Sequence, residues 1–328
     1  MKALIKNKLF LFGAIICLIL TVISTLGYLI TPDSSTNANT IVHEWKNLKP
    51  GAKVLYIDEN SSTPNAEINL WELWWNGSPS NNHIKPILPS EITQYKHQQV
   101  YSKTFWMGSD QFGRDMLSRM IIGGRVSLSI GFLAMISSLI IGTFIGLLSG
   151  FLGGLYDKFF SWLIAVFWSV PTLLIAMGLS MFLPKGFYQV LLATALSTWV
   201  EVARVVRGQA IQLREREYIL AAKINGFSSV RIMFLHILPN LKGSLTVLAT
   251  TNFASAILLE AGLGFLGLGV SPPTPTWGMM VKENMGYLVL DNASMALIPG
   301  IAIMILVMAF NLMSMGLRDV LDPRTTNQ

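Results

Sequence analysis

Long apolar runs constrain this chain more than any other feature of its sequence. The first, Leu9–Ile30, extends over 22 residues without a charge, which is enough for a helix to cross the hydrocarbon core of a bilayer. Five more runs of spanning length follow, at about 126–149, 159–183, 188–206, 245–268 and 296–317. Hydrophobic residues make up 52% of the chain and charged residues 13%, and the mean hydropathy is +0.51. We therefore predict an all-α membrane protein with six transmembrane helices.

The first apolar run also has features of a secretory signal peptide. Lys2, Lys6 and Lys8 precede it, but it is longer than a typical signal-peptide core and no small-residue cleavage motif follows it. We therefore predict a retained transmembrane helix within residues 1–30. Cys17 is the single cysteine of the chain, so the sequence excludes an internal disulfide and a metal site built from several cysteines.

The segment that follows, residues 31–105, has no run of spanning length and is rich in Asn, Ser, Pro and Lys. We predict that it is an extracytoplasmic insert in water, a solvated appendage whose Ser/Asn-rich start, Ser34–Asn39, can be removed with little effect on transport. Three tryptophans cluster within the insert, at Trp71, Trp74 and Trp75. They indicate a small core or an anchor at the membrane interface more than a ligand-stacking site.

The distribution of lysine and arginine predicts the orientation of the spans. With the N-terminus in the cytoplasm, thirteen of these residues fall in cytoplasmic segments and only Lys185 and Lys282 in short outer loops. The other nine lie in the long first outer segment, and charge in so long a segment has little influence on orientation. Positive charge is enriched on the cytoplasmic side of membrane proteins, so both termini are predicted to be cytoplasmic. The net charge of +6 then reflects topology, and we expect no nucleic-acid partner. The membrane core occupies 106–328, entered through an amphipathic segment at 105–125 and with a cytoplasmic loop at about 207–242.

A polar segment, Arg214–Asn240, separates two of the predicted spans and cannot itself cross a bilayer. It carries the signals of a helical hairpin. Glu215 and Glu217 suit the first turn of a helix and Lys223 suits the last, because the helix dipole favours those charges at those ends. Gly226 suits a left-handed C-terminal cap.

The second helix of this hairpin has boundary signals of its own. Ser228 can cap its N-terminus, and Pro239 marks where it must end or kink. In the first helix, Ala221 and Ala222 are adjacent and small, so we expect that face to let another surface come close. A membrane protein that holds a folded polar hairpin at its surface is usually presenting it to a partner.

Four stretches of the chain resemble motifs of one family. The pattern A-A-x-x-x-G, followed after eleven residues by L-P, resembles the coupling loop of ABC importer membrane subunits, and H-I-L-P-N resembles its form in the dipeptide, oligopeptide and nickel permeases. Gly108–Leu128, beginning G-S-D-Q-F-G-R-D, Glu260–Gly278, beginning E-A-G-L-G-F-L-G-L-G, and Asn311–Pro323 resemble three further motifs of that family. The resemblance extends from about Gly108 to the C-terminus and points to a C-type subunit.

The resemblance implies a bacterial inner-membrane, multi-pass permease that forms half of a translocation pore for di- or oligopeptides. As partners it implies a homologous B-type permease, two cytosolic ABC ATPase subunits and an extracytoplasmic solute-binding protein, besides the lipid bilayer. ATP and Mg would belong to the ATPase subunits, so we expect no cofactor, metal or catalytic residue in this chain. The resemblance assigns the coupling loop to Glu217, Leu220, Ala221, Ala222, Gly226, Leu238 and Pro239.

The sequence departs from the family pattern at several positions. Leu220 occupies the place of the loop's usual glutamate, and Glu217, one turn earlier, does not simply replace it. Gly264 stands where the family usually has serine. Ser314 and Met315 replace a Gly-Asp pair near the C-terminus, so the resemblance supports no acidic group there.

Glu260 is the acidic residue that most suggests a role in transport. A charge near a span is unfavourable unless it pairs, reaches the interface or contacts water. Glu260 either takes part in the pore or caps the glycine-rich turn that follows it. We consider Glu260, Gly264, Gly267 and Trp277 as a possible translocation path or gate.

Two other patterns within the spans are interpreted as structural. Glu201 and Arg204 are three residues apart on one helical face, so we expect a local ion pair. Four-residue spacing of small residues favours close helix packing, and it recurs at Gly142, Gly146, Gly150 and Gly154.

Other functional classes stay open at this point. An ion-gradient-driven secondary transporter or channel predicts inverted repeats, broken helices at the midplane and more charge within the membrane. A membrane enzyme is disfavoured because the sequence contains no clustered catalytic motif. For an importer, peptides are the expected cargo, with nickel or another small solute as the alternative.

Overall fold

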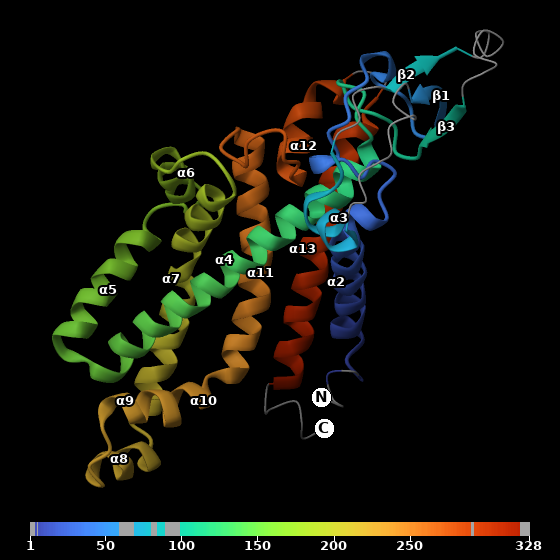
Figure 1. The fold of residues 1–328 in the computed structure, drawn as a ribbon. Coiled ribbons are helices and arrows are strands. Elements are labelled where there is room, and N and C mark those ends of the chain that lie inside the picture. The colour runs from blue at the N-terminus through green and yellow to red at the C-terminus, as the bar shows by residue number, and fades with distance from the viewer. Residues whose placement is uncertain are drawn as a thin grey trace. The chain divides into compact units, whose positions relative to one another are not determined.

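A computed structural model of the chain describes residues 4, 6–58, 69–79, 84–88, 99–289 and 292–321. Within these residues, two helices that bend by 93° at a short break, α5 (Gly154–Trp168) and α6 (Thr172–Phe182), can together form one span. Five single helices are long and apolar enough to cross a membrane (Figure 1): α2 (Lys8–Leu26), α4 (Met116–Leu152), α7 (Phe187–Arg214), α11 (Lys242–Leu266) and α13 (Ser294–Leu321). The predicted helical membrane protein of about six spans is confirmed.

The chain divides into two compact units. The helical unit contains Met1–Leu18, Leu128–Leu263 and Met304–Gln328, and the insert unit contains Ile19–Ser127 and Gly264–Ile303. Several long helices contribute residues to both, because each unit takes one part of α2, α4, α11 and α13.

In the helical unit, α4 packs closely on α7 through glycines. A Cβ atom at Gly142 would lie 2.6 Å from the Val202 Cβ, and one at Gly146 would lie 2.8 Å from the Val206 Cβ. Gly150 makes the same kind of approach to Ala210. The predicted close packing is therefore confirmed for these three glycines. Gly154 does not belong to it, because it has a φ of +56° and nothing within 4 Å of a Cβ.

The third predicted span differs from the expected continuous helix. The chain breaks at Ser169–Pro171, between α5 and α6, and the two helices differ in direction by 93°. Pro171 lacks an N–H group, and proline disfavours the helical conformation of the residue before it. A hydropathy pattern counts apolar residues along the chain and so does not detect such a break.

The second span also differs from the prediction. The segment at 105–125 was expected as a separate amphipathic approach, but its second half, from Met116, belongs to α4, a single helix of 37 residues. Asp115 caps its start, since the Ser118 backbone N–H donates to Asp115 Oδ2 at 2.9 Å.

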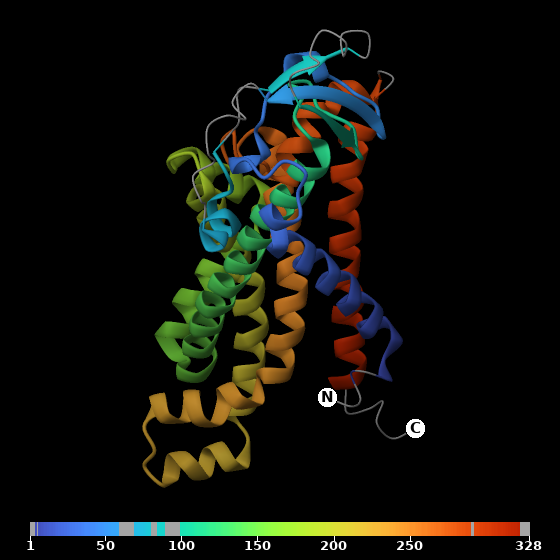
Figure 2. The ribbon, with the colours of Figure 1, turned by 45° about the vertical axis from the view of Figure 1, so that its right-hand side comes forward.

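The two ends of the chain meet inside the helical unit. Figures 1 and 2 both show the first part of α2 beside α13. Gly13 directly faces the Ala309 carbonyl oxygen, and a Cβ at Gly316 would lie 2.7 Å from Phe10. These positions have no room for a side chain, which explains two glycines in otherwise apolar helices.

The insert unit contains a three-stranded antiparallel sheet with the order β2-β1-β3, which the sequence analysis did not predict. Its strands are β1 (Ala52–Asp58), β2 (Ile84–Ile87) and β3 (Val100–Phe105). Val42, Trp45 and Phe105 form its small buried core. Parts of the predicted insert, at 59–68, 80–83 and 89–98, lie outside the described residues.

The clustered tryptophans do not form this core. They lie on α3 (Leu70–Asn76), where Trp71 is 69% and Trp75 61% exposed. Trp74 instead donates from its indole nitrogen to the Thr25 carbonyl oxygen near the end of α2, at 2.7 Å. The Arg125 guanidinium lies over its ring at 4.7 Å. The prediction that the three tryptophans form a small core is therefore wrong. Their role as an anchor at the membrane interface stays a prediction.

The start of the insert is not a solvated appendage. Asp33 accepts hydrogen bonds from the Ser35 and Thr40 backbone N–H groups, and its own N–H donates to the Ser118 hydroxyl at 2.9 Å. Asp33, Ser35 and Ala38 are buried. The polar composition of this segment predicted exposure to water. Composition does not show that these polar groups form hydrogen bonds with one another and can therefore be buried.

A buried ion-pair network connects the start of α4 to α12 (Trp277–Asn284) within the same unit. Arg114 pairs with Asp110 at 2.6 Å and with Glu283 at 3.2 Å, and Arg119 pairs with Glu283 at 3.3 Å. The first of the family-like motifs, Gly108–Leu128, therefore has a structural role here.

Candidate functional site

The hairpin between α7 and α11 is the best-defined candidate site. Helix α7 ends at Arg214, and α8 extends over Glu217–Ile224. Glu217 occupies the first turn of α8 and Lys223 the last, as predicted from the helix dipole. Glu215 does not lie in that first turn. It caps the C-terminus of α7 and pairs with Arg214 at 3.0 Å.

Helix α8 ends in a Schellman turn. Gly226 has a φ of +76°, and its N–H donates to the Lys223 carbonyl at 3.0 Å. The Phe227 N–H donates to the Ala222 carbonyl at 3.1 Å. These two bonds satisfy carbonyl groups that the helix end leaves free. Gly226 is therefore the predicted left-handed cap. A Cβ atom at this position would have nothing within 4 Å, so the positive φ, and not a lack of space, is the reason for glycine.

The second half of the hairpin begins with the predicted cap. Ser228 accepts a hydrogen bond from the Arg231 N–H at 3.3 Å, at the start of α9 (Ser229–Ile232). A π-helical turn, Met233–Ile237, then leads into α10 (Leu238–Asn240). Pro239 was predicted either to end the helix or to kink it. The helical segment continues through Pro239, so it does not end there. The wider turn before it accommodates the proline, which cannot donate to the preceding turn.

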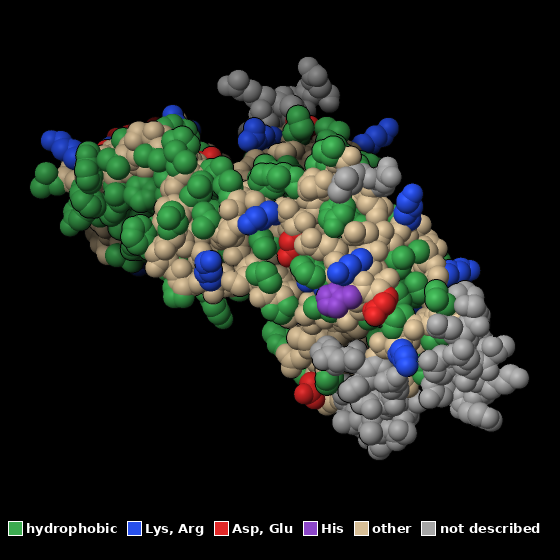
Figure 3. Space-filling model, turned by 90° about the horizontal axis from the view of Figure 1, so that it is seen from above, with side chains coloured by type: hydrophobic (Ala, Val, Ile, Leu, Met, Phe, Trp, Pro, Cys, Tyr) green, Lys and Arg blue, Asp and Glu red, His purple; other side chains and the backbone are tan. Residues whose placement is uncertain are grey.

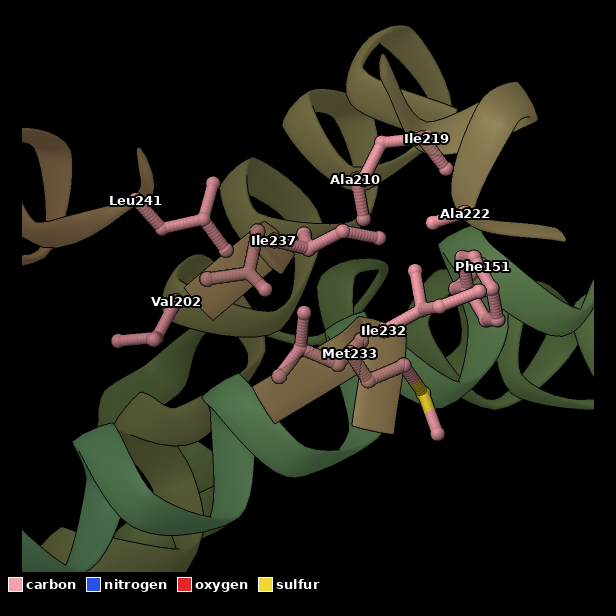
Figure 4. Packing of buried hydrophobic residues seen from close by; sticks show 11 residues of the cluster. Phe151, Val202, Ala210, Ile219, Ala222, Ile232, Met233, Ile237 and Leu241 are labelled. Carbon is pink, nitrogen blue, oxygen red and sulfur yellow. The ribbon is translucent and has the colours of Figure 1, made fainter. Parts of the chain in front are cut away.

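One face of the hairpin is embedded in the protein's own core. Figure 4 shows Ala222 and Ile219 of α8 close to Phe151 of α4 and Ala210 of α7. Ala222 is only 6% exposed. The buried cluster, which joins α4, α7 and the hairpin, consists of Leu147, Phe151, Val202, Val206, Ala210, Ile219, Ala222, Ile232, Met233, Ile237 and Leu241.

This burial corrects the expectation that Ala221 and Ala222 both face another surface. Ala222 packs inward, whereas Ala221 is exposed. Adjacent residues on a helix point about 100° apart, so one of two neighbouring alanines can pack inward while the other is exposed. Sequence spacing identified the small residues without deciding which of them faces outward.

The outer face of the hairpin carries exposed apolar side chains. Ile224 is 87% exposed and Leu220 is 42% exposed. Glu217 and Pro239 are also exposed, while Leu238 is half-buried. Tyr218 and Val230 add to this outer face. A folded hairpin with one face in its own core and apolar residues on the other is suited to bind a second protein.

A polar cluster of Asp157, Arg207 and Ser149, which was not predicted from the sequence, forms a clamp between helices. The Arg207 guanidinium donates to both carboxylate oxygens of Asp157, at 2.7 and 2.9 Å. The Ser149 hydroxyl donates to the same carboxylate at 2.6 Å. The clamp joins α4, α5 and α7. An acidic residue in the first turn of α5 and an arginine in the C-terminal part of α7 were the only sequence signals.

The four residues considered as a gate do not form one exposed group. Trp277 is buried, and its indole nitrogen donates to the Met120 carbonyl at 2.9 Å. Gly264 lies within α11, where a Cβ would be 2.9 Å from the Met279 backbone nitrogen. Gly267, with a φ of +82°, begins the turn after α11.

These three residues belong to the insert unit and have packing roles there. Glu260 belongs to the helical unit and is completely buried near the end of α11. The turn predicted to begin with the first glycines of G-L-G-F-L-G-L-G begins only at Gly267, because Gly262 and Gly264 are helical.

No metal centre is found in the part of the chain that the structure describes: no group of three or more His, Cys, Asp or Glu side chains is placed to hold an ion. Cys17 is buried in α2. The end of the fourth family-like motif, Pro323, lies outside the described residues.

Comparison with known proteins gives consistent results. Residues 142–327 match the family described as binding-protein-dependent transport system inner membrane component. The chain is 40% identical over 243 residues to the dipeptide transport system permease protein of Alkalihalophilus pseudofirmus, covering 73% of this chain and 80% of that protein. It is 39% identical over 223 residues to the oligopeptide transport system permease protein of Bacillus subtilis, covering 68% and 73%.

A glutathione transport system permease protein of Escherichia coli is 38% identical over 219 residues, covering 67% of this chain and 72% of that protein. Among solved structures, the MetNI methionine ABC transporter in inward-facing conformations has a similar fold. That chain is 18% identical with a TM-score of 0.50, and the match covers 63% of this chain and 98% of that chain. At this identity the similarity concerns the fold alone.

Proposed function

Because the chain belongs to the family of binding-protein-dependent transport system inner membrane components, we propose that it is the C-type permease subunit of an ATP-driven peptide importer. It forms half of the pore and pairs with a homologous B-type permease. A solute-binding protein delivers cargo on the outer side. Two cytosolic ATPase subunits hold the ATP and Mg.

Peptides are the cargo class that the relatives support. Their names specify dipeptides, oligopeptides and glutathione. All of these carry an ammonium group, a carboxylate and amide bonds, so one aqueous path with polar and charged walls suits them. Nickel is the alternative cargo within the family resemblance, and no metal-binding group among the described residues favours it.

The hairpin is the proposed ATPase-docking element, and its two-faced construction is the observation that carries this proposal. The inward face, with Ile219 and Ala222, is fixed by the cluster shared with α4 and α7. The outward face offers Leu220, Ala221 and Ile224. Closure of an ATPase dimer on ATP would displace the hairpin, and the shared core would pass this displacement to α4 and α7 as one body.

The orientation follows from the same proposal. The hairpin and both chain termini lie on the cytoplasmic side, and the insert with its sheet lies outside. The thirteen-to-two bias of lysine and arginine supports this orientation.

The alternative, transport driven by an ion gradient, predicted broken helices, and the α5–α6 break is one such feature. It does not favour that alternative, because the family match covers the helix break as well as the hairpin. The energy source itself separates the two: import that continues without ATP and stops on collapse of the proton gradient would contradict the importer.

The test is copurification of the ATPase with variants of the outer face. Ile224→Glu places a charge where the ATPase groove would contact an apolar side chain, so we expect much less ATPase per permease and reduced uptake. Val289→Glu is the matched control, since Val289 is 93% exposed and lies in the insert unit. Wild-type copurification and uptake with Ile224→Glu would exclude the hairpin face as the docking element.

A further inference from the structure

Glu201 and Arg204 do not form the ion pair expected from their spacing. The Arg204 guanidinium lies over the Trp168 ring, 4.5 Å from its centre. The Glu201 side chain is exposed, and it has no hydrogen bond or ion pair with any described residue. Arg204 therefore leaves the carboxylate uncompensated.

The position of Glu201 along α7 makes this exposure significant. Glu201 lies fourteen residues after Phe187, or about 21 Å along the helix axis, and six residues, or about 9 Å, before Arg207. It therefore lies inside the predicted span at 188–206, five residues before its end, in a helix that is apolar enough to cross the membrane. A carboxylate at this depth is strongly unfavourable against lipid chains and is typically found facing water or a partner group.

A pocket of about 300 Å³ lies beside the carboxylate. One wall comes from the break between α5 and α6, with Trp168, Ser169 and Pro171, and the other from α7, with Ser197 and Glu201. Because the break removes part of a helix, it leaves space next to α7 that a continuous third span would have filled.

Trp168 separates the two charges. It lines the pocket that contains Glu201 and also a second pocket that contains Arg204. With the guanidinium held on the indole ring, the first pocket keeps a net negative charge. In Figure 3, hydrophobic side chains cover most of the surface over α6. The Glu201 carboxylate is thus a charged group next to a largely apolar surface.

We propose that Glu201 and the pocket at the α5–α6 break form a cation-binding site on the translocation path, which receives the α-ammonium group of a peptide. A carboxylate forms strong, charge-assisted hydrogen bonds with an ammonium ion. Peptide amino termini are largely protonated at neutral pH. The inference rests on the proposed peptide import.

The experiment uses the complete transporter in proteoliposomes, with Glu201→Gln as the variant. Two radiolabelled peptides are compared, one with a free amino terminus and one Nα-acetylated, both first shown to bind the solute-binding protein. We expect Glu201→Gln to lower uptake of the free peptide roughly tenfold at low concentration, the loss of one charge-assisted hydrogen bond. Uptake of the acetylated peptide should stay near the wild-type value.

Arg204→Gln is the matched control, one turn away on the same helix. It should leave the preference for the free peptide unchanged. Equal uptake losses for both peptides with Glu201→Gln, or no loss for either, would overturn the site. Loss of the copurifying partner permease would instead assign Glu201 to the subunit interface. Import of neither peptide by the wild-type transporter would overturn the peptide proposal, and the site with it.

Discussion

Three neighbouring positions in the hairpin hold small residues or glycine, and the packing and backbone of this chain explain two of them. Gly226 has a φ of +76° and no atom within 4 Å of a Cβ, so only its backbone conformation demands glycine. Ala222 is small because the cluster around Phe151 and Ala210 leaves no further room. Ala221 is small on an exposed surface, which nothing within this chain explains.

The first prediction concerns the turn at Gly226. Gly226→Val should lower the free energy of unfolding by about 1–2 kcal/mol, because a β-branched residue resists the left-handed conformation. Gly226→Asn should cost clearly less, since asparagine tolerates it. Thermal unfolding of the purified transporter in detergent measures both. Equal stability of the two variants would mean that the turn can relax.

The second prediction separates the two alanines. Ala222→Trp should destabilise the subunit by about 1–3 kcal/mol, because it overfills the cluster. Ala221→Trp should change stability by less than about 0.5 kcal/mol and lower the amount of copurified ATPase. Leu220→Glu serves as a surface control that should fold normally. If Ala221→Trp bound the ATPase as wild type does, the exposed alanine would lie outside the docking surface.

At the scale of elements, the distance between α4 and α7 is short because the backbones of the two helices contact each other at glycines. Glycines at three successive turns of α4 face carbonyl oxygens of α7, including those of Trp199 and Ala203. Because the glycines have no side chain that could change its rotamer, the two helix backbones cannot shift easily against each other. We therefore expect α4 and α7 to move together. The Asp157–Arg207 ion pair adds α5 to this body.

The third prediction tests that contact. Gly146→Ala places a Cβ 2.7 Å from the Ala203 carbonyl oxygen, so the helices must separate and the subunit should lose about 1–3 kcal/mol of stability. Gly178→Ala in α6 is the matched control, with nothing within 4 Å, and should be neutral or stabilising by up to about 1 kcal/mol. The thermal unfolding midpoints of the two variants give the comparison. Equal midpoints would contradict close packing.

At the scale of the whole molecule, the proposed topology places the insert and the hairpin on opposite sides of the membrane. Cys17 is buried and is the single cysteine, so Cys17→Ser provides a background for labelling. Leu70 on α3 is 74% exposed and Ile224 on α8 is 87% exposed. Both positions are therefore accessible to a probe.

The fourth prediction follows directly. A membrane-impermeant thiol reagent should label Leu70→Cys in intact cells and Ile224→Cys only after permeabilisation. The result depends on side chain location alone and not on transport activity. Labelling of both positions from the same side would overturn the proposed orientation.

Local chemistry made much of this protein predictable. The lengths of apolar runs predicted the spans, and the caps at Gly226 and Ser228 were predicted because a cap depends on a few consecutive residues. The family-like motifs predicted a permease, which the comparisons confirmed.

Long-range packing decided the rest. Ala222 faces inward because residues from α4 and α7, many positions away, complete its surroundings. Arg204 rests on Trp168 rather than on Glu201 because α5 packs beside α7 and places its last residue within reach of the guanidinium. The insert forms a sheet because β1 pairs with strands on both of its edges, one of them β3, which starts more than forty residues later. Sequence alone thus determined which segments are long and apolar enough to span a membrane and where some helices are capped. Only the tertiary structure decided which side chains face the core, the water or each other, because that depends on contacts between residues distant in the chain.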